Sequence, residues 1–423
     1  MRLSIGWILI LFVGASLWGQ SKAEPPAPDQ AEGAPAAGPP PQSRADEIQR
    51  SRELKSRNLA PDMGSRLEQR IIRLRRNKVF EDLTGPPDGF GLAFGGLAVS
   101  QGFAAGVQFR KSDIWDGRLH FRAAARASAR KAYLVDFTAG LPHLANDHMF
   151  FDLRSYHFDY PNVQYYGPGP NSDRNGRSVF RLENTGVEIK PGLRLAPGLT
   201  LGAVGSFLAV NVGHGDNSEL APTEAIYGPS TTPGIDHQSS FLQGGGFLQF
   251  DWRDYPGEAT RGGNYKVQYE VVSDRDLHLG SFNRLDLEAQ QYIPFFAEKR
   301  VLALRGRTIL TDPRRGQRVP FYLQPTLGGS DSLRGYRSYR FYDDNSVLLT
   351  AEYRYEVFSG LDMALFVDGG KVFHKWSQWN LHDLESDVGF GFRFNVHNNV
   401  FLRLDAGFSH EGFQIWFKLT NVF

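Results

Sequence analysis

The sequence predicts an all-β protein: a 16-stranded antiparallel transmembrane β-barrel that a short helical periplasmic segment precedes. Three observations predict this fold class. From residue 85 to the end, apolar and polar residues alternate with a period of two, which gives each strand one apolar and one polar face. The mean hydropathy is nevertheless negative, because alternation hides a lipid-facing surface from averaging. The 46 glycines and the aromatic fraction of 13% suit many short strands, tight turns and aromatic belts at membrane interfaces.

Composition excludes several classes of protein. A helical membrane protein needs runs of about 20 apolar residues, and the one such run lies at the very start of the chain. The chain has no cysteine, which excludes disulfides, thiol chemistry and cysteine-bound zinc. The formal charge of +1 argues against a nucleic-acid partner, because such proteins depend on bulk electrostatic attraction.

Residues 1–23 are expected to form a secretory signal peptide. Arg2 supplies the positive start, an apolar stretch runs from Ile5 to Leu17, and small residues follow up to Ala23. A transmembrane anchor is the alternative, and the shortness of the apolar run favours cleavage. Residues 24–44 are rich in Pro, Ala and Gly, so we expect a disordered spacer that cannot bury a core.

Residues 45–84 are expected to form the helical periplasmic segment. A helical stripe of Leu67, Ile71 and Leu74 is surrounded by arginines. One interpretation is a solvated surface helix with a narrow docking stripe. The other is a helix that plugs or props the barrel mouth, or lies on anionic lipid. The sequence leaves both open.

The barrel itself is predicted to span residues 85–423. Alternation is clearest in the later segments, such as 265–271, 388–396 and 402–408, where every second residue is apolar and the others are polar, charged or glycine. The last segment ends on Phe423 with Phe413, Ile415 and Phe417 on the same face. The sixteen strands are predicted to begin near residues 88, 101, 116, 130, 147, 177, 197, 238, 262, 281, 299, 346, 361, 384, 399 and 412.

An even number of strands places both ends of the barrel on the periplasmic side and lets the first strand meet the last. Long connections at about 159–176, 213–237 and 312–345 are then expected to face outside the cell. The first strand is rich in glycine and weakly patterned, which indicates few lateral contacts and a weak seam against the last strand.

One long loop combines glycines with an arginine that is unusual for a freely solvated segment. Residues 327–337 read LGGSDSLRGYR. On the next two strands, the position of a residue in the alternation, its parity, decides which face it occupies. Parity places Glu352, Arg354 and Asp368 toward the lumen. Inward carboxylates need a cation, and a loop folded into the lumen could place the planar fork of Arg334 between two of them. The alternative is that these are ordinary channel-lining charges, paired with cations of the wall itself such as Arg305, Arg307 or Arg354.

These residues resemble a family. The run at 333–336 (Leu333, Arg334, Gly335 and Tyr336) is similar to the Arg-Gly-aromatic signature in the sixth extracellular loop of the BamA/TamA superfamily of outer-membrane assembly and transport barrels. Glu352 with Arg354 resembles its Glu-x-Arg strand motif, and FVDGG at 366–370 resembles its aromatic-x-Asp-x-Gly motif. The resemblance implies that the loop folds into the lumen, where Arg334 contacts acidic residues such as Asp368 on the strands that follow. The terminal Phe423 resembles the family's C-terminal assembly signal.

The sequence departs from the family before residue 85. Family members that insert proteins carry periplasmic POTRA domains, whereas here only the spacer and the helical segment precede the barrel. We therefore expect a short member that lacks POTRA domains, in the bacterial outer membrane. Its expected partners are outer-membrane lipid and lipopolysaccharide, the barrel assembly machinery for its own insertion, and a separate periplasmic protein that replaces the POTRA domains.

Three functions remain open. The first is assistance to membrane protein insertion or translocation through the weak lateral seam. The second is a passive channel or pore lined by the same charges. The third is a structural surface antigen whose lumen the inturned loop plugs.

Enzyme signals are weak. The run YYGPGPNSD at 165–173 precedes no helix, so a phosphate loop is not indicated. His214 and Asp216 lie in a predicted loop, where such a pair indicates surface rather than a metal site. The chain has no Gly-x-Ser-x-Gly elbow. We expect no enzymatic activity, no cofactor and no metal.

Overall fold

The computed structural model of the chain describes residues 88–423 except for residues 96, 297–298, 359, 397–398 and 420–423. All of these belong to one of the two units of the chain, residues 64–423, and only this unit is described below. The predicted signal peptide, spacer and helical segment, together with Phe423, lie outside the described residues. They stay predictions.

The unit is built on one antiparallel sheet in which each strand pairs with the next along the chain. Its sixteen strands are β1 (Gly89–Phe94), β2 (Ala104–Ile114), β3 (Leu119–Ser128), β4 (Tyr133–Leu144), β5 (Met149–Tyr165), β6 (Ser178–Ala196), β7 (Leu199–His214), β8 (Ser239–Asp251), β9 (Gly262–Asp274), β10 (Phe282–Phe295), β11 (Arg300–Pro313), β14 (Asn345–Phe358), β15 (Leu361–Phe373), β16 (Glu385–Val396), β17 (Asn399–Ser409) and β18 (Gly412–Lys418). The prediction of sixteen antiparallel strands is confirmed, and each strand begins within three residues of its predicted start.

Short elements occupy the connections. A two-stranded sheet joins β12 (Thr326–Leu327) to β13 (Phe341–Tyr342). The helical turns are η2 (Val99–Gln101), α4 (Thr223–Ile226), η3 (Phe321–Leu323) and η4 (Trp376–Gln378). No helix in the described part of the chain is long and apolar enough to cross a bilayer.

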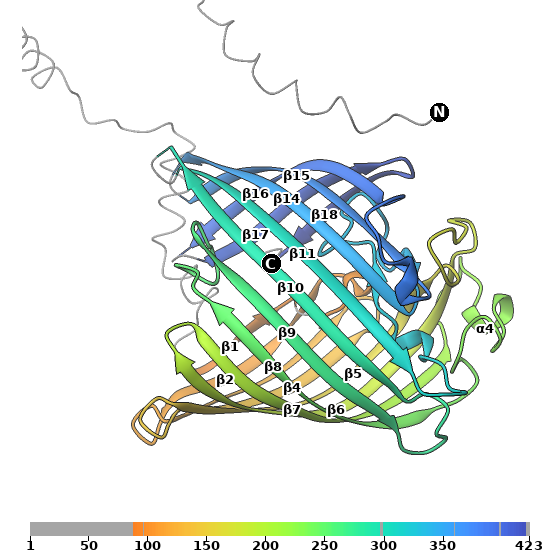
Figure 1. Ribbon diagram of the computed structural model, residues 1–423, viewed down its shortest axis with the longest axis horizontal. Coiled ribbons are helices and arrows are strands. Elements are labelled where there is room, and N and C mark those ends of the chain that lie inside the picture. The colour runs from red at the N-terminus through yellow and green to blue at the C-terminus, as the bar shows by residue number, and fades with distance from the viewer. Residues whose placement is uncertain (1–87, 96, 297–298, 359, 397–398, 420–423) are drawn as a thin grey trace, which may run out of the picture. The chain divides into compact units, whose positions relative to one another are not determined.

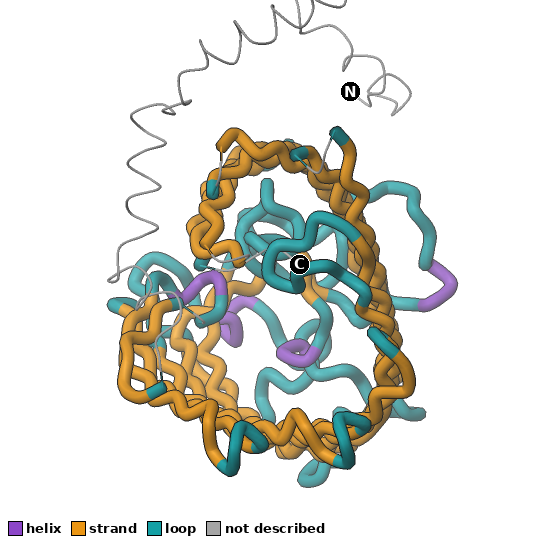
Figure 2. The backbone as a smooth tube through the Cα atoms, turned by 90° about the vertical axis from the view of Figure 1, so that its left-hand side faces the viewer, coloured by secondary structure: helices purple, strands orange, loops and turns teal. Residues whose placement is uncertain are grey.

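The strands cross Figure 1 diagonally, and Figure 2 shows them as a curved wall around loops. Turns of a few residues join most strands at one end of this wall. Long loops emerge at the other end, which we call the long-loop end: residues 166–177, 215–238, 314–344 and 374–384.

The two faces of the wall have the polarity of a barrel in lipid rather than in water. On β16, Val388 and Phe390 are 53% and 43% exposed on the outer face. The alternate residues Asp387 and Arg393 are buried on the inner face. In water this arrangement would be unfavourable on both faces, because apolar groups favour burial and charges favour solvation. With hydrocarbon outside and a polar lumen inside, both faces are matched to their surroundings.

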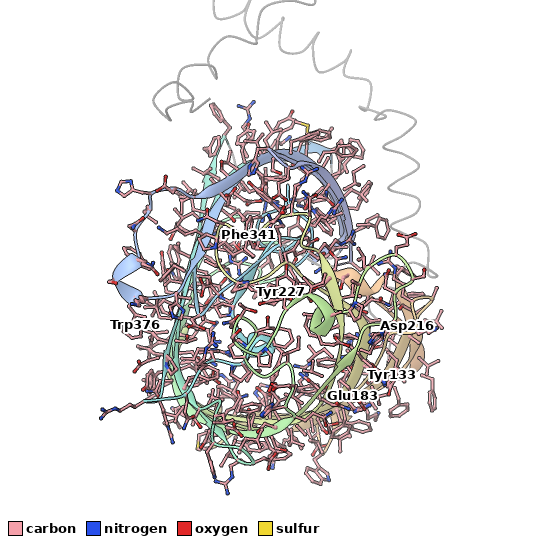
Figure 3. All side chains as sticks on the ribbon, turned by 90° about the vertical axis from the view of Figure 1, so that its right-hand side faces the viewer. Tyr133, Glu183, Asp216, Tyr227, Phe341 and Trp376 are labelled. Atoms are coloured by element: carbon pink, nitrogen blue, oxygen red, sulfur yellow. The ribbon has the colours of Figure 1, made fainter. Side chains whose placement is uncertain are left out.

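A cluster of aromatic side chains packs inside the wall near the long-loop end. Strand residues such as Phe180, Phe241 and Phe282 form one buried cluster with Phe321 and Tyr342 of the loop between β11 and β14. The rings of Phe180 and Phe321 lie 4.8 Å apart between centroids in an edge-to-face arrangement. In the end view of Figure 3, the labelled Phe341 and Tyr227 project within the outline of the strands, whereas Trp376 lies on a loop outside it.

The connection between β1 and β2 turns inward instead of extending the wall. Gln101 is buried, and its side-chain amide donates a hydrogen bond to the carbonyl oxygen of Asn162 at 3.1 Å. The Ser100 hydroxyl donates to the same oxygen at 3.2 Å. Gly102, with φ of 83°, allows the chain to leave the lumen again. The first strand therefore has only six residues, whereas β6 has nineteen.

Candidate functional site

The candidate site is centred on the loop between β11 and β14, residues 314–344, which we call the inturned loop. Gly328 and Gly329 have φ of 106° and 107°, a region in which side chains other than glycine are strained. The turn that follows is closed by backbone hydrogen bonds from Gly329 and Tyr336 to the carbonyl group of Leu333. Leu333 and Tyr336 are fully buried and pack with residues of β14 and β15 such as Leu348. Apolar side chains thus hold the loop inside the wall.

Arg334 lies at the tip of the inturned loop, and its side chain is completely buried. Its guanidinium group donates to Asp368 of β15 through Nε and Nη2, at 2.7 and 3.0 Å. The remaining nitrogen, Nη1, donates to Glu352 of β14 at 2.6 Å. The ring of Phe366 lies beneath the guanidinium carbon, 3.3 Å away at its centroid. Burial alone would lower the pKa of Arg334, but Asp368 and Glu352 hold that pKa above its ordinary value.

Glu352 accepts hydrogen bonds from three arginines. Besides Arg334, it accepts hydrogen bonds from Arg354 Nε and Arg393 Nη2, both at 2.9 Å. Arg393 also donates to Asp405 of β17 at 2.6 Å. The sequence left open whether the carboxylate would pair with the loop or with the wall, and Glu352 pairs with both. The charges form one connected network over β14 to β17, in which opposite charges alternate.

Sequence reasoning did not assign Arg393, Arg403 or Asp405 to the site. Arg403 forms an ion pair with Asp405 at 3.0 Å and donates to the carbonyl oxygen of Ser330 in the inturned loop at 2.6 Å. The available signal was the strand pattern: each of these residues is charged and stands between apolar neighbours, as in Leu402–Arg403–Leu404. Parity places such a charge in the lumen.

Two glycines let the loop backbone lie directly on the wall. A Cβ atom at Gly407 of β17 would stand 2.5 Å from the carbonyl carbon and oxygen of Arg334. A Cβ atom at Gly335 would stand 2.5 Å from Cβ of Asp387. The Ser409 hydroxyl donates to the carbonyl oxygen of Gly335 at 2.9 Å. The Arg-Gly pair of the loop is therefore matched by glycine on the opposing strand.

The inturned loop also contacts the last strand, β18. Trp416 Nε1 donates to the carbonyl oxygen of Arg334 at 2.7 Å. Lys418 pairs with Asp331, whose other oxygen lies 3.2 Å from Arg403. The Tyr336 hydroxyl donates to Glu385 at 2.7 Å. The loop therefore links five consecutive strands, β14 to β18, from within the lumen.

Among the described residues, Asp343, Asp344 and His374 form a group that could hold a metal ion. His374 Nδ1 lies 2.8 Å from Asp344, whose second oxygen accepts from Gln324 at 2.8 Å. An ion pair between the base of the inturned loop and the β15–β16 loop accounts for this geometry. His214 and Asp216 have separate partners, Glu224 and Lys131 respectively.

A lipid-facing sheet of sixteen strands whose lumen holds a loop pinned by a buried arginine defines a class: outer-membrane β-barrels with an inturned sixth loop. The family can then be stated. The Omp85 superfamily domain matches residues 120–408, and the chain belongs to this superfamily. The resemblance to the BamA/TamA superfamily is thereby confirmed, and so is the outer-membrane location.

Two solved structures show the same fold. BamA from Haemophilus ducreyi lacking POTRA domains 1–3 is 13% identical with a TM-score of 0.57, over 78% of this chain and 69% of that one. CdiB from Escherichia coli is also 13% identical with a TM-score of 0.50, over 78% of this chain and 61% of that one. The chain thus spans less than two thirds of this CdiB. Comparison with curated proteins finds no match.

Proposed function

We propose that this barrel assists the insertion or translocation of other polypeptides through a lateral seam between β1 and β18. The observation that carries the proposal is the unpaired edge of β18. Among the described residues, β18 pairs with β17 on one side, and no strand pairs with its other side. An exposed row of backbone donors and acceptors can add a further strand, which is how β-strand addition recognises a polypeptide.

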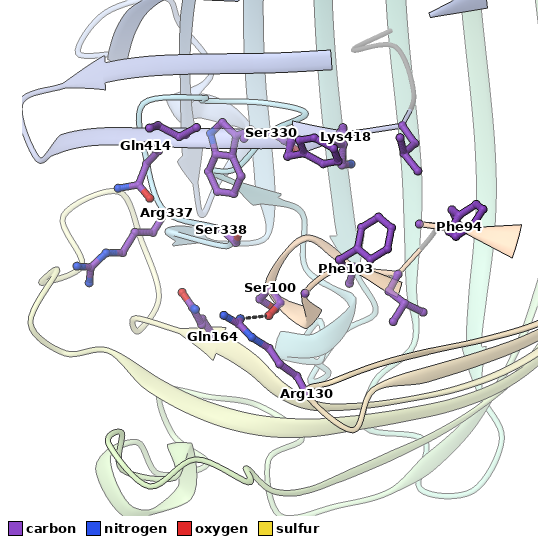
Figure 4. A pocket seen from close by; sticks show the side chains of 18 of the residues that line it. Phe94, Ser100, Phe103, Arg130, Gln164, Ser330, Arg337, Ser338, Gln414 and Lys418 are labelled. Carbon is purple, nitrogen blue, oxygen red and sulfur yellow. Dashed lines mark hydrogen bonds between the residues drawn. The ribbon is translucent and has the colours of Figure 1, made fainter. Parts of the chain in front are cut away.

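A cavity of about 640 Å³ lies along this edge, and we call it the seam cavity. Its lining includes Gln414 to Lys418 of the last strand, Leu419 after it, and Phe94 and Phe103 from either side of the β1–β2 connection. Figure 4 shows β18 above the opening, with Ser100 and Arg130 below it. The space is open because the β1–β2 connection turns into the lumen instead of continuing β1 alongside β18.

The inturned loop holds the β18 side of the seam. Trp416 and Lys418 of β18 are held by Arg334 and Asp331 of the loop. We infer that the charged network around Arg334 braces β14 to β18 as one stiff panel. Leu333, Gly335, Tyr336, Glu352, Arg354 and Asp368 belong to this brace. Opening at the seam would then move β1 and β2 against a fixed β18, since β1 is short and pairs only with β2 among the described residues.

A disulfide across the seam tests the proposal. A Cβ atom at Gly95 would lie 4.0 Å from Cβ of Leu419, which is within the range that a disulfide requires. Because Gly95 has a φ of 67°, cysteine is strained there, so the reduced variant must first show wild-type function. The chain has no cysteine, so the Gly95→Cys/Leu419→Cys pair would be the sole thiol pair. We expect oxidation to abolish client insertion in reconstituted vesicles or to block complementation in cells, and reduction to restore it.

The matched control is Ala406→Cys/Ile415→Cys, which links residues that are already paired between β17 and β18. This second disulfide should leave function intact. Full activity with the Gly95–Leu419 bond closed would refute a role for the seam.

The aromatic packing at the long-loop end favours a second function, a plugged surface antigen without transport. Val319, Phe321 and Tyr342 of the inturned loop belong to the buried cluster that packs inside the wall at this end. The same packing argues against a wide passive pore, because an apolar constriction disfavours water and ions. Planar-bilayer recordings separate the pore from the other two functions. A large steady conductance supports the pore. Absence of conductance together with client insertion supports the seam.

The remaining partners follow from the proposed role. We infer that Phe423 is recognised by the barrel assembly machinery when this chain is itself inserted. A separate periplasmic protein would supply the client-receiving step that POTRA domains perform in other members of the superfamily. The role proposed here is mechanical and needs no catalytic residue or cofactor. Co-purification from crosslinked outer membranes would identify such a partner.

A further inference from the structure

The charged side chains that line the seam cavity are all positive. Its lining contains four cations, Arg130, Arg177, Arg337 and Lys418, and no carboxylate among the described lining residues. They come from four separate places: the β3–β4 turn, the residue before β6, the inturned loop and β18. Elsewhere in the lumen, by contrast, arginines alternate with aspartates and glutamates, as around Glu352.

Three of the four cations of the cavity, the arginines, have no acidic partner among the described residues. Arg130 donates to the carbonyl oxygen of Ser100 at 2.7 Å. Arg337 lies near the hydroxyl group of Tyr166. The Nε atom of Arg177 is buried and has no hydrogen-bond partner among the described residues. Within the described part of the chain, Lys418 is the one cation of the four with an acidic partner, Asp331. Arg130 and Arg337 are exposed where they line the cavity, so an anion that enters the cavity can reach both.

The outer rim of the cavity is apolar. Phe103, Ile415 and Phe417 line it and are 59%, 70% and 58% exposed on the lipid side. A ligand in this place would therefore meet guanidinium groups at one end and hydrocarbon at the other. Planar guanidinium groups favour bidentate contacts with phosphate oxygens. The chemistry that fits is a phosphate group attached to acyl chains.

We propose that the seam cavity binds a phosphorylated acyl lipid of the outer leaflet, with its phosphate between Arg130, Arg177 and Arg337 and its chains along Phe103, Ile415 and Phe417. The outer leaflet follows from topology, because all three arginines belong to connections on the long-loop side of the sheet. The site does not depend on the proposed function, since a lipid can occupy the cavity whether or not the seam opens. Bound there, the lipid covers the unpaired edge of β18 and must leave before a strand can pair with it.

The test uses the purified folded barrel in an uncharged detergent and native mass spectrometry. The probes are bisphosphorylated lipid A, phosphatidylcholine and inorganic phosphate. We expect lipid A to remain bound at a concentration at least tenfold lower than phosphatidylcholine, with binding weakened by added salt. The Arg130→Gln/Arg337→Gln variant should lose this preference by about tenfold or more.

The matched control is Arg314→Gln/Arg315→Gln, which removes two exposed arginines of the inturned loop that do not line the seam cavity. This variant should bind lipid A like the wild type. Both variants are first checked for the heat-dependent gel shift of a folded barrel, so that lost binding is not lost folding.

Three results would overturn the proposal. One is equal lipid A binding by the Arg130→Gln/Arg337→Gln variant and the wild type. Another is displacement of lipid A by inorganic phosphate at a similar concentration, which would show that the chains contribute nothing. The third is occupation of the cavity by an extended client-strand peptide when lipid A does not bind at all.

Discussion

The indole nitrogen of Trp416 donates a hydrogen bond to the carbonyl oxygen of Arg334, 2.7 Å away. The side chain of Arg334 is at the same time bound to Asp368 and Glu352. One loop residue thus joins the last strand, by its backbone, to β14 and β15, by its guanidinium group. Loss of the arginine contacts should therefore be felt at β18.

Removing the charge of Arg334 should be strongly destabilising. In Arg334→Gln, Glu352 keeps Arg354 and Arg393, but Asp368 loses both of its guanidinium hydrogen bonds. Asp368 also stands opposite Asp387 in the β15–β16 pairing, so two buried carboxylates would face each other. Breaking one side of a buried pair costs about 3–5 kcal/mol. Urea unfolding of the barrel in detergent micelles should show a loss of this size.

The second variant in this test is Arg334→Gln/Asp368→Asn, which also removes the carboxylate that Arg334→Gln leaves without a partner. It should recover part of the lost stability, because an amide pair is less costly to bury than a lone charge. The exposed Arg315→Gln change should have little effect. Equal stability of Arg334→Gln and wild type would rule out the brace.

A methyl group at Gly407 should displace the loop without altering any charge. In Gly407→Ala the new Cβ atom would lie 2.5 Å from backbone atoms of Arg334, which cannot move aside as a flexible side chain can. Overpacking of this kind costs about 1–3 kcal/mol. The control is Gly244→Ala on β8, where nothing lies within 4 Å of the added atom. Similar urea midpoints for both variants would contradict close contact between loop and wall.

Trp416→Phe should loosen β18 while leaving β14 and β15 unchanged. The aromatic ring is kept, but the carbonyl oxygen of Arg334 loses its donor, at a cost of about 1–3 kcal/mol. Hydrogen exchange followed by mass spectrometry should show faster exchange in residues 412–418. Trp376→Phe is the matched control, because Trp376 makes an equivalent bond to the carbonyl oxygen of Thr311 on the outer side. Unchanged exchange in β18 would show that the loop does not hold this strand.

The alternation of apolar and polar residues predicted the strands of the wall well. When lipid lies on one side of a sheet, a period of two assigns every residue either to the lipid face or to the lumen face. On β14, parity alone puts Glu352 and Arg354 on the inner face, and both are buried there. A single misplaced residue would have sent these charges into hydrocarbon, so the register is tightly constrained. The strand starts could be read from the sequence for the same reason.

Other parts of the site could not be read from the sequence, because they depend on contacts between distant segments. The inward turn after β1 rests on hydrogen bonds from Ser100 and Gln101 to Asn162, about sixty residues away. The ion pair of Arg393 with Asp405 depends on how β16 and β17 are aligned. Parity tells which face a charge occupies, but it does not tell which neighbour the charge meets across the lumen.

Acid should release the loop from β18 through Asp331. Burial favours the neutral acid, but Lys418 and Arg403 outweigh it and hold the pKa of Asp331 below its ordinary value of about 3.9. Because the pKa is lowered on folding, this pairing stabilises the loop fully above about pH 4 and loses its effect as pH falls through the folded-state pKa. The side chain is 46% exposed, so the contribution is small. Hydrogen exchange in β18 should rise between pH 5 and pH 3 in wild type, after correction for the intrinsic rate, and rise less in Asp331→Asn. The same rise in both proteins would show that Asp331 has no part in docking the loop.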